Sequence, residues 1–545
     1  MAWIRPREGK TGAVWFSVLL GLFVAFGGVL YGYDTGIING VLAMKYWREN
    51  FSTGYRNPND GGLDITSAQS SLIVSILSVG TFFGALSAAP LSDQIGRRLS
   101  LCVGNVVFVV GVALQTASTA IPTFTAGRCV AGLGVGIISA TIPLYQSETA
   151  PKWLRGTIVG TYQLSITIGL LIASIVNNAT KNRVDSGSYR IPVAVQFAWA
   201  IILFTGALFL PETPRYLVKI GNPEKALASL SRLRRLAIDH AALKEELLEI
   251  QANHEYELRI GSARWVDCYK GGNLKRLATS CVLQALQQLT GVNFIFYYGT
   301  TFFQNSGIEN PFIISMITNC INTISTFPGL WAVERYGRRS LLLVGAVGMC
   351  VCQFIVAIVG TVDHGASAQK ALVAFVCIYI FFFASTWGIG AWVVTSELFS
   401  LKVRAKCLAQ SVATNWLFNW ALAYSTPRLV GTGPGNAGLG AKVFFIWGGS
   451  CFVCIFFTYF FIFETKGLSL EEVDELFEQV KSAHKSKAFV PTVTFQGLQN
   501  GGKEGGGAND TDPGTSVEKP LSHGHVESAA SGQDNSAPVT PYLPY

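Results

Sequence analysis

The sequence predicts an all-α membrane protein whose twelve transmembrane helices form two duplicated halves of six. Of the 545 residues, 50% are hydrophobic and only 14% are charged, whereas soluble proteins carry roughly 25% charged residues. Uncharged apolar runs of about 20 residues, the length that crosses a bilayer core as a helix, recur along most of the chain. A repeated set of charged motifs is the third observation. Together they exclude an ordinary water-soluble enzyme.

The apolar runs define the order of the helices. They start near Ala13, Ser67, Leu99, Pro122, Thr157, Pro192, Thr279, Phe312, Leu341, Ala371, Cys407 and Val443. The first run is too long for a signal peptide, so we expect a permanent span. The widest gaps divide the spans six and six. We expect a tail over 1–12, the first half over 13–210, a central helical segment over 211–276, the second half over 277–464, a C-terminal helix over 465–486 and a disordered tail over 487–545.

The net charge of +8 comes from Lys and Arg clusters in short loops that alternate with the spans. The positive-inside rule places these loops, the central segment and both termini in the cytoplasm. Within the central segment we expect amphipathic helices over 224–235 and 242–252. Nucleic-acid binding is not expected, because topology explains the charge. The 11 cysteines show no metal-ligand spacing, so we expect neither a metal nor a cofactor.

Charged motifs recur at the ends of corresponding spans in the two halves. Asp93-Gln-Ile-Gly-Arg-Arg98 returns as Glu334-Arg-Tyr-Gly-Arg-Arg339. The pair Glu148 and Arg155 returns as Glu397 and Arg404, and Glu212-Thr213 returns as Glu464-Thr465. The halves are therefore duplicates, an arrangement typical of secondary transporters with a substrate site between the halves.

Several ordered motifs give a more specific resemblance, which runs from about Tyr31 to Phe477. They are Gly32-Tyr-Asp-Thr-Gly36, the two Gly-Arg-Arg motifs, Gly127-Arg128, Glu148 to Gly156, Pro211 to Leu217, Gln287 to Asn293 and Ser396 to Ser400. With these motifs the chain resembles the sugar porter family of the major facilitator superfamily, and above all its fungal hexose transporters. The resemblance implies a monomer in the lipid bilayer of the plasma membrane that moves a monosaccharide, most of all glucose, by alternating access.

The resemblance implies an inner gate of salt bridges that join span ends on the cytoplasmic side. Its candidates are Asp93, Arg97, Glu148, Arg155, Glu212, Glu334, Arg338, Glu397, Arg404 and Glu464. The simpler alternative is anchoring by the positive-inside rule. Surface ion pairs are individually worth only ~0–1 kcal/mol, so a network of them suits a latch that opens in every cycle.

Asp34 and Arg128 are charges inside predicted spans, where a charge is costly and usually faces a partner or a cavity. Spans one and four are neighbours in the superfamily, so the two residues can pair. One hypothesis is a proton switch, in which protonation of Asp34 releases Arg128; the alternative is a permanent ion pair that fixes packing. In symporters of the family the matching acid accepts the proton, but passive facilitators keep an acid here as well. We expect proton-coupled uptake, with passive facilitation as the alternative.

A sugar site needs uncharged donors and acceptors for several hydroxyls and an aromatic face for the ring. The candidates are Gln163, Gln287, Gln288, Asn293, Asn322, Trp392 and Asn415. Membrane amides can instead join helices, and we prefer that interpretation for Asn319 and Asn419. Gln287, Gln288 and Asn293 flank Gly291, as in the broken outer-gate helix of the family.

Two groups of glycines have expected structural roles. Span ten reads Trp387-Gly-Ile-Gly-Ala-Trp392, where many relatives have a proline after the first glycine, and we expect Gly388 and Gly390 to supply a flexible break. In span four, Gly127, Gly132 and Gly136 recur at helical spacing, which predicts close helix packing.

A glucose sensor that signals from the same fold is the competing function, because some fungal relatives act as receptors. An enzyme is not expected, since no nucleophile–base pair, metal cluster or nucleotide-binding loop is evident. The sequence does not rank glucose against other hexoses, because such sugars differ only in the placement of single hydroxyls.

Overall fold

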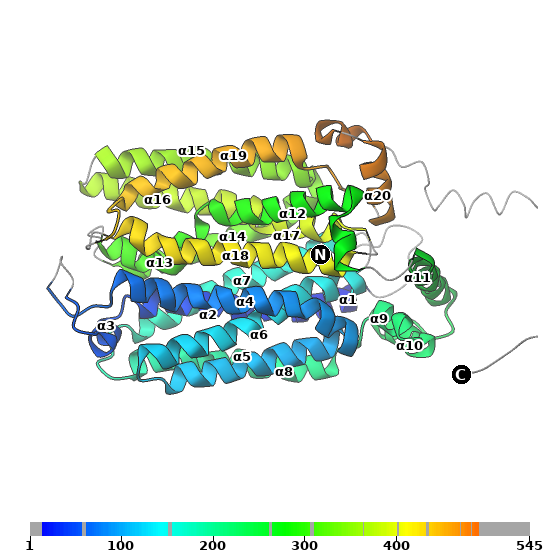
Figure 1. Cartoon of the computed structure of the whole chain (residues 1–545), viewed down its shortest axis with the longest axis horizontal. Helices are drawn as coiled ribbons and strands as arrows, with labels where there is room; N and C mark the ends of the chain where they lie inside the picture. The colour runs from blue at the N-terminus through cyan, green and yellow to red at the C-terminus, as the bar shows by residue number, and fades with distance from the viewer. Residues whose placement is uncertain are drawn as a thin grey trace, which may run out of the picture. The chain divides into compact units, whose positions relative to one another are not determined.

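The first half supplies six crossings of a helical bundle (Figure 1). They are α1 (Val14–Ala25) with α2 (Gly27–Val41), α4 (Ser67–Ile95), α5 (Arg97–Ala117), α6 (Ile121–Thr149), α7 (Arg155–Thr180) and α8 (Gly187–Phe209).

This computed structural model describes residues 14–56, 61–150, 155–260, 264–305, 310–362, 365–400, 403–431, 435–468, 470–480 and 482–489. The expected tail over 1–12, and that over 487–545 from residue 490 onward, lie outside the described residues.

The second half repeats the six crossings, two of them interrupted. They are α12 (Gly271–Leu289) with α13 (Val292–Asn305), α14 (Pro311–Tyr336), α15 (Arg338–Val362), α16 (Ala366–Phe382) with η4 (Phe383–Trp387) and α17 (Gly388–Glu397), α18 (Arg404–Val430) and α19 (Val443–Phe461). The twelve-helix fold is thus confirmed. α4 packs against α18 and α7 against α14 across the two halves.

Shorter helices distinguish the two ends of the bundle (Figure 1). One end, here the α3 end, carries α3 (Lys45–Phe51). The other, here the α10 end, carries α9 (Pro214–Lys219), α10 (Pro223–Arg234), α11 (Ala241–Ile260), η3 (Trp265–Tyr269), α20 (Leu470–Gln479) and η6 (Ala483–Ala488). The expected amphipathic helix over 242–252 is longer, because α11 continues to Ile260.

Nine helical segments of the described chain are long and apolar enough to cross a membrane. The three crossings that do not meet this criterion are α12 with α13, α14 and α18. α14 and α18 are nevertheless 26 and 27 residues long, which exceeds the roughly 20 residues that a bilayer core requires. Their lower hydropathy reflects buried amides such as Gln287, Asn322 and Asn415.

The duplicated Gly-Arg-Arg motifs form equivalent turns in the two halves. Gly96 ends α4 and Gly337 ends α14, and both have φ of 89°, a backbone conformation that glycine adopts without a Cβ clash. The next residue in each motif, Arg97 or Arg338, begins the following helix. The duplication seen in the sequence is therefore also a duplication of backbone geometry.

Close packing of α6 confirms the expected role of its glycines. A Cβ on Gly132 would lie 2.2 Å from the carbonyl oxygen of Leu77, and one on Gly136 would lie 2.3 Å from that of Thr81. Both carbonyls belong to α4. A Cβ on Gly127 would lie 2.8 Å from the backbone nitrogen of Gln115 on α5. Small residues of this kind let helix backbones approach in membrane bundles.

Candidate functional site

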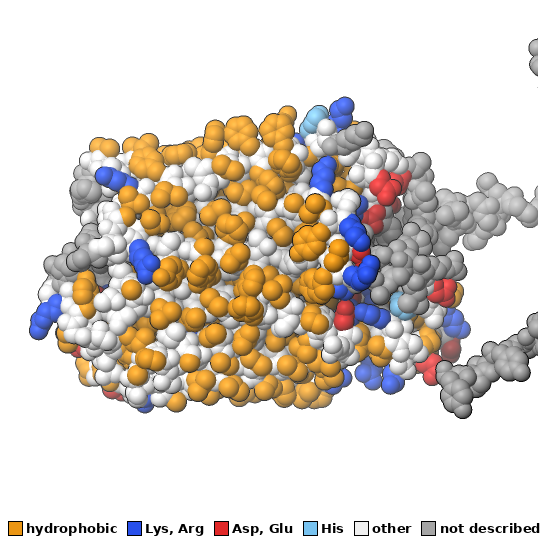
Figure 2. Space-filling view, viewed as in Figure 1, with side chains coloured by type: hydrophobic (Ala, Val, Ile, Leu, Met, Phe, Trp, Pro, Cys, Tyr) orange, Lys and Arg blue, Asp and Glu red, His pale blue; other side chains and the backbone are white. Residues whose placement is uncertain are grey.

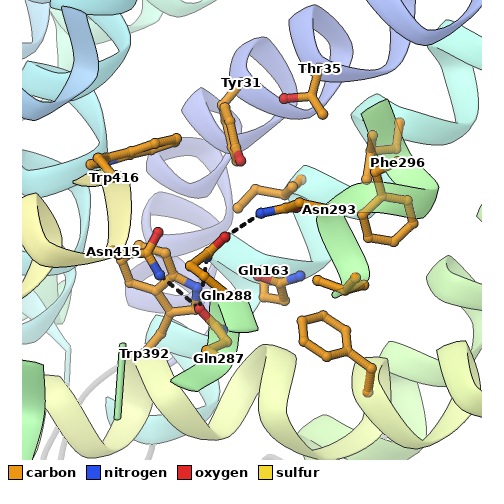
Figure 3. Close-up of a pocket in the computed structure, with 14 residues that line it drawn as sticks. Tyr31, Thr35, Gln163, Gln287, Gln288, Asn293, Phe296, Trp392, Asn415 and Trp416 are labelled. Atoms are coloured by element: carbon orange, nitrogen blue, oxygen red, sulfur yellow. Dashed lines mark hydrogen bonds between the residues drawn. The ribbon is translucent and has the colours of Figure 1, made fainter. Parts of the chain in front are cut away.

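A small cavity lies between the two halves and collects polar side chains from both (Figure 3). Its lining includes six of the seven predicted site residues, namely Gln163, Gln287, Gln288, Asn293, Trp392 and Asn415. Asn322 is fully buried on α14 but is not among the lining residues. The space open to water molecules is about 40 Å³, which is room for a few waters.

Hydrogen bonds join the amides of the second half into one network. Asn415 Nδ2 donates to Gln284 Oε1 at 2.7 Å and to Gln287 Oε1 at 2.9 Å. Asn293 Nδ2 donates to Gln288 Oε1, which also accepts from Asn419 Nδ2 at 3.2 Å. The network fixes the directions of these side chains before any ligand arrives.

A π-helical turn in the tenth crossing contributes a backbone acceptor to this network. The turn spans Phe383–Trp387, immediately before Gly388, and Gln287 Nε2 donates to the carbonyl oxygen of Trp387 at 3.1 Å. The expected break at Gly388 and Gly390 is therefore displaced, because both glycines are helical residues of α17. Such π turns occur often at functional sites.

The seventh crossing breaks between α12 and α13, as the motif around Gly291 predicts. Gly291 has φ of 82°, and a Cβ there would lie 2.4 Å from the indole of Trp447. The carbonyl oxygen of Thr290 accepts from Tyr379 Oη at 2.9 Å and from Gln353 Nε2 at 3.1 Å. These two donors satisfy a carbonyl at the end of α12 that the helix itself leaves free.

Aromatic side chains complete the cavity, and the sequence did not single most of them out. Trp416 meets Tyr31 edge to face with ring centroids 4.8 Å apart, and Trp392 meets Tyr162 in the same way at 5.5 Å. The lining residues missed from the sequence include Tyr31, Thr35, Phe296, Phe383 and Trp416. Tyr31 directly precedes the Gly32-Tyr-Asp-Thr-Gly36 motif and Thr35 lies within it, so the motif was a usable signal for both.

Asp34 and Arg128 form an ion pair between α2 and α6. Arg128 Nη1 lies 3.5 Å from Asp34 Oδ2, and both side chains are 0% exposed. Within the described chain, neither carboxylate oxygen of Asp34 has a hydrogen-bond donor and no guanidinium nitrogen of Arg128 has an acceptor. The two charges therefore depend chiefly on each other for stabilisation.

Charged residues of the first half meet at the α10 end. Arg97 Nη2 lies 2.9 Å from Glu148 Oε1, and Arg97 Nη1 lies 3.8 Å from Asp93 Oδ1. Glu212 accepts from the backbone nitrogen atoms of Arg97 and Arg98 at 3.0 and 3.1 Å. Burial raises the pKa of the Glu212 carboxyl, although its backbone donors act in the opposite direction.

The second half repeats this cluster residue by residue. Arg338 Nη2 lies 2.8 Å from Glu397 Oε1, and Arg338 Nη1 lies 3.2 Å from Glu334 Oε2. Glu464 accepts from the backbone nitrogen of Arg338 at 2.8 Å, as Glu212 does from Arg97. Each of these bonds joins span ends within one half.

The remaining two gate candidates, Arg155 and Arg404, begin α7 and α18. Arg404 Nη2 donates to the carbonyl oxygen of Phe399 at 3.4 Å. The side chain of Arg155 lies outside the described part of the structure, but the next residue, Gly156, marks a contact between the halves. A Cβ on Gly156 would lie 2.4 Å from Glu334 Oε1 and 2.8 Å from Arg338 Nη2.

At the α3 end the halves are joined by contacts that the sequence did not reveal. Arg48 Nη2 donates to Gln304 Oε1 of the second half at 2.8 Å, while Arg48 Nη1 lies 3.7 Å from Asp64 Oδ2 of its own half. The backbone nitrogen of Thr300 donates to Asn39 Oδ1 at 3.0 Å. The cavity thus has contacts between the halves on both sides of it.

Comparison with known proteins gives consistent results. The family model described as "Sugar (and other) transporter" matches residues 20–477. The chain is 59% identical over 515 residues to "Major facilitator-type transporter ecdD" of Aspergillus rugulosus, covering 92% of this chain and 94% of the relative. It is 50% identical over 520 residues to "Probable glucose transporter rco-3" of Neurospora crassa, covering 94% and 87%.

Two further comparisons concern a sensor and a solved structure. The chain is 44% identical to "High glucose sensor RGT2" of Saccharomyces cerevisiae, covering 86% of this chain and 61% of the sensor. The solved structure of the proton:xylose symporter XylE has a TM-score of 0.73 at 24% identity, covering 85% of this chain and 99% of XylE. This structural likeness shows the major facilitator fold.

Proposed function

Because the chain belongs to the sugar transporter family of the major facilitator superfamily, we propose that it transports a monosaccharide, most of all glucose, by alternating access. The observation that carries this proposal is the cavity between the halves, lined by amides and indoles. Amides both donate and accept hydrogen bonds, so a small set of them matches several sugar hydroxyls at once. The identity of 50% to the relative named as a glucose transporter makes glucose the first sugar to test.

The sugar takes over hydrogen bonds that the amides now make with one another. Gln287, Gln288, Asn293 and Asn415 bind hydroxyls from the second half, and Gln163 does so from the first. Trp392 packs against the apolar side of the ring. A space of about 40 Å³ requires the halves to separate before a hexose enters. Asn322 takes part only if that separation exposes it.

The α10 end faces the cytoplasm and the protein lies in the plasma membrane as a monomer. Charged side chains gather at this end, over α9, α10, α11 and α20, whereas the visible face of the bundle is largely hydrophobic (Figure 2). The excess of Lys and Arg in short cytoplasmic loops is the usual mark of this orientation. In the sequence, three further basic residues precede α1, namely Arg5, Arg7 and Lys10.

The duplicated charge clusters form the inner gate. Gly156 lies beside Glu334 and Arg338, so movement of α7 away from α14 changes the surroundings of the second cluster. The gate opens when these contacts between the halves separate and the sugar leaves to the cytoplasm.

Uptake is driven by a proton that binds Asp34. Protonation removes the charge that stabilises buried Arg128, so the ion pair that joins α2 to α6 is broken when a proton arrives. Passive facilitation, with the pair serving only as a structural element, is the alternative.

Uptake of labelled glucose in a host that lacks its own hexose carriers tests the proposal. We expect saturable uptake that exceeds the external concentration and is lost when an uncoupler collapses the proton gradient. Uptake that reaches only the external concentration, and is unaffected by the uncoupler, would replace symport by facilitation. Expression at the surface without uptake, accompanied by a transcriptional response to glucose, would favour the sensor, for which the 44% identity to RGT2 is the reason.

A further inference from the structure

A second pocket, separate from the cavity between the halves, lies at the α10 end of the first half. It has a volume of about 480 Å³. Its apolar wall is formed by Phe16 and Leu20 of α1 and by Phe209 at the end of α8, and its cationic wall by Arg232 and Arg235 at the end of α10. The pocket therefore combines an apolar surface with two guanidinium groups.

The two arginines have no acidic partner within salt-bridge distance in the part of the chain that the structure describes. Their neighbour Arg234 differs, because its Nη2 lies 2.7 Å from Glu246 Oε1. The guanidinium of Arg235 lies 4.2 Å from the ring centroid of Phe16 and 5.7 Å from that of Trp15. The positive charge is held over aromatic faces and remains available to an anion.

The backbone of Arg235 gives independent support for a role of its side chain. Arg235 ends α10 with φ of 54°, and it is the only non-glycine residue with positive φ among those described. Glycine is the usual residue at this position after a helix, because other residues pay a steric cost there. An arginine at a position suited to glycine is explained if its side chain makes favourable contacts, and the packing on Phe16 is one contact to which a bound anion would add.

The position of the pocket indicates which anion it binds. Phe209 is 83% exposed and Trp15 is 56% exposed, on helices whose apolar surface faces the bilayer. Trp is enriched at the membrane–water interface, where its amphipathic ring lies at the level of the headgroups. The pocket thus lies where the lipid-facing surface ends and the basic helix α10 begins, which is where a phospholipid places its headgroup.

We propose that this pocket binds an anionic phospholipid of the cytoplasmic leaflet. The lipid phosphate lies between Arg232 and Arg235, and an acyl chain follows Leu20 and Phe209. Ser17 Oγ already donates to the carbonyl oxygen of Leu233 at 2.8 Å and accepts from Arg234 Nη1 at 3.2 Å, so a bound lipid adds a further link between α1 and α10. The assignment of the leaflet rests on the orientation proposed above, whereas the site itself does not require that the protein carry sugar.

Binding of phosphatidylserine to the purified full-length protein, measured by native mass spectrometry with phosphatidylcholine as competitor, tests the proposal. In the wild type we expect phosphatidylserine to be retained in preference to phosphatidylcholine. Arginines near a membrane surface contribute enough binding free energy that removing both in R232Q/R235Q should weaken phosphatidylserine binding about 30-fold. R235G should weaken it about fivefold without harming the fold, because glycine accepts the backbone conformation that strains arginine.

A matched control removes two positive charges elsewhere. Arg428 also packs on an aromatic ring, with its guanidinium 4.4 Å from the ring centroid of Tyr424. Both Arg428 and Lys442 are exposed. R428Q/K442Q should leave the preference for phosphatidylserine unchanged. An equal loss in this control would overturn the proposal, since the lipid would then respond to net charge alone.

Competition with inorganic phosphate distinguishes a lipid-binding site from a site for soluble anions. If phosphate at equal concentration displaces phosphatidylserine or protects the protein from heat equally well, the pocket is a soluble-anion site and the lipid proposal fails. Retention of phosphatidylserine by R232Q/R235Q at the wild-type level would also refute it. Because binding is measured without transport, failure here leaves the proposed sugar transport untouched, and absent uptake leaves the lipid site untouched.

Discussion

Replacing Asp34 by Asn removes one charge of an ion pair whose two members are both 0% exposed. Arg128 then keeps its charge without an acidic partner, and within the described residues none of its nitrogen atoms has another acceptor. Breaking a buried pair on one side typically costs about 3–5 kcal/mol. We therefore expect D34N to lower the unfolding midpoint of the purified protein. We also expect D34N to abolish glucose accumulation against a gradient while retaining sugar binding, because Asn imitates a permanently protonated Asp.

The double variant D34N/R128Q separates the structural from the coupling role. Removing both charges relieves the unpaired guanidinium, so the unfolding midpoint should return toward that of the wild type. Accumulation should not return, since no group is left to bind the proton. The assay is uptake of labelled glucose with and without an uncoupler, at matched surface expression. If D34N accumulates sugar normally, or if the double variant recovers accumulation, the proton does not bind at Asp34 and the pair is structural.

Three further predictions concern the site, the gate and the packing. Asn293→Ala should raise the glucose concentration for half-maximal uptake roughly 5- to 150-fold, because a lost interior hydrogen bond costs about 1–3 kcal/mol; unchanged kinetics at normal expression would remove Asn293 from the site. Arg338→Gln leaves buried Glu397 without its cation, so a cysteine placed on the cytoplasmic side of the cavity should react faster with a thiol reagent, and equal rates would contradict the gate. Gly132→Ala places a Cβ 2.2 Å from a backbone oxygen of α4 and should destabilise the protein by about 1–3 kcal/mol, which thermal unfolding measures. Gly449→Ala is the control and should be neutral, because no atom lies within 4 Å of the Cβ that it adds.

Periodic apolar runs and repeated motifs were sufficient to predict the fold. Span positions follow from burial of apolar side chains in lipid, and the repeated charged motifs predicted that the two halves are duplicates. Three crossings were predicted although they are less apolar than the other nine, because their length and flanking motifs were clear. The fold could be predicted from the sequence because apolar runs and charged motifs are each visible within a short stretch of residues.

The candidate site was less accessible to sequence reasoning. Whether an amide faces the cavity depends on the rotation of its helix, so Asn322 and Asn415 could not be told apart. Tyr31 was overlooked because an aromatic residue in an apolar run has the same pattern whether it lines a cavity or packs in a core. The π turn at Phe383–Trp387 has no sequence mark of its own, which is why the break was expected at the following glycines.

The interruption between α12 and α13 has a consequence for how a transported sugar differs from an analogue that only binds. The end of α12 is tied to its own half by the bonds that Tyr379 and Gln353 make to Thr290, whereas Asn293 belongs to α13, beyond the turn at Gly291. If the sugar binds as proposed, it replaces the bond that Asn293 now makes to Gln288 and connects the two segments through its own hydroxyls, so its binding energy moves the outer segment. A sugar analogue without the hydroxyl that reaches Asn293 would occupy the site and leave α13 where it was. Such a molecule would compete with glucose without being carried.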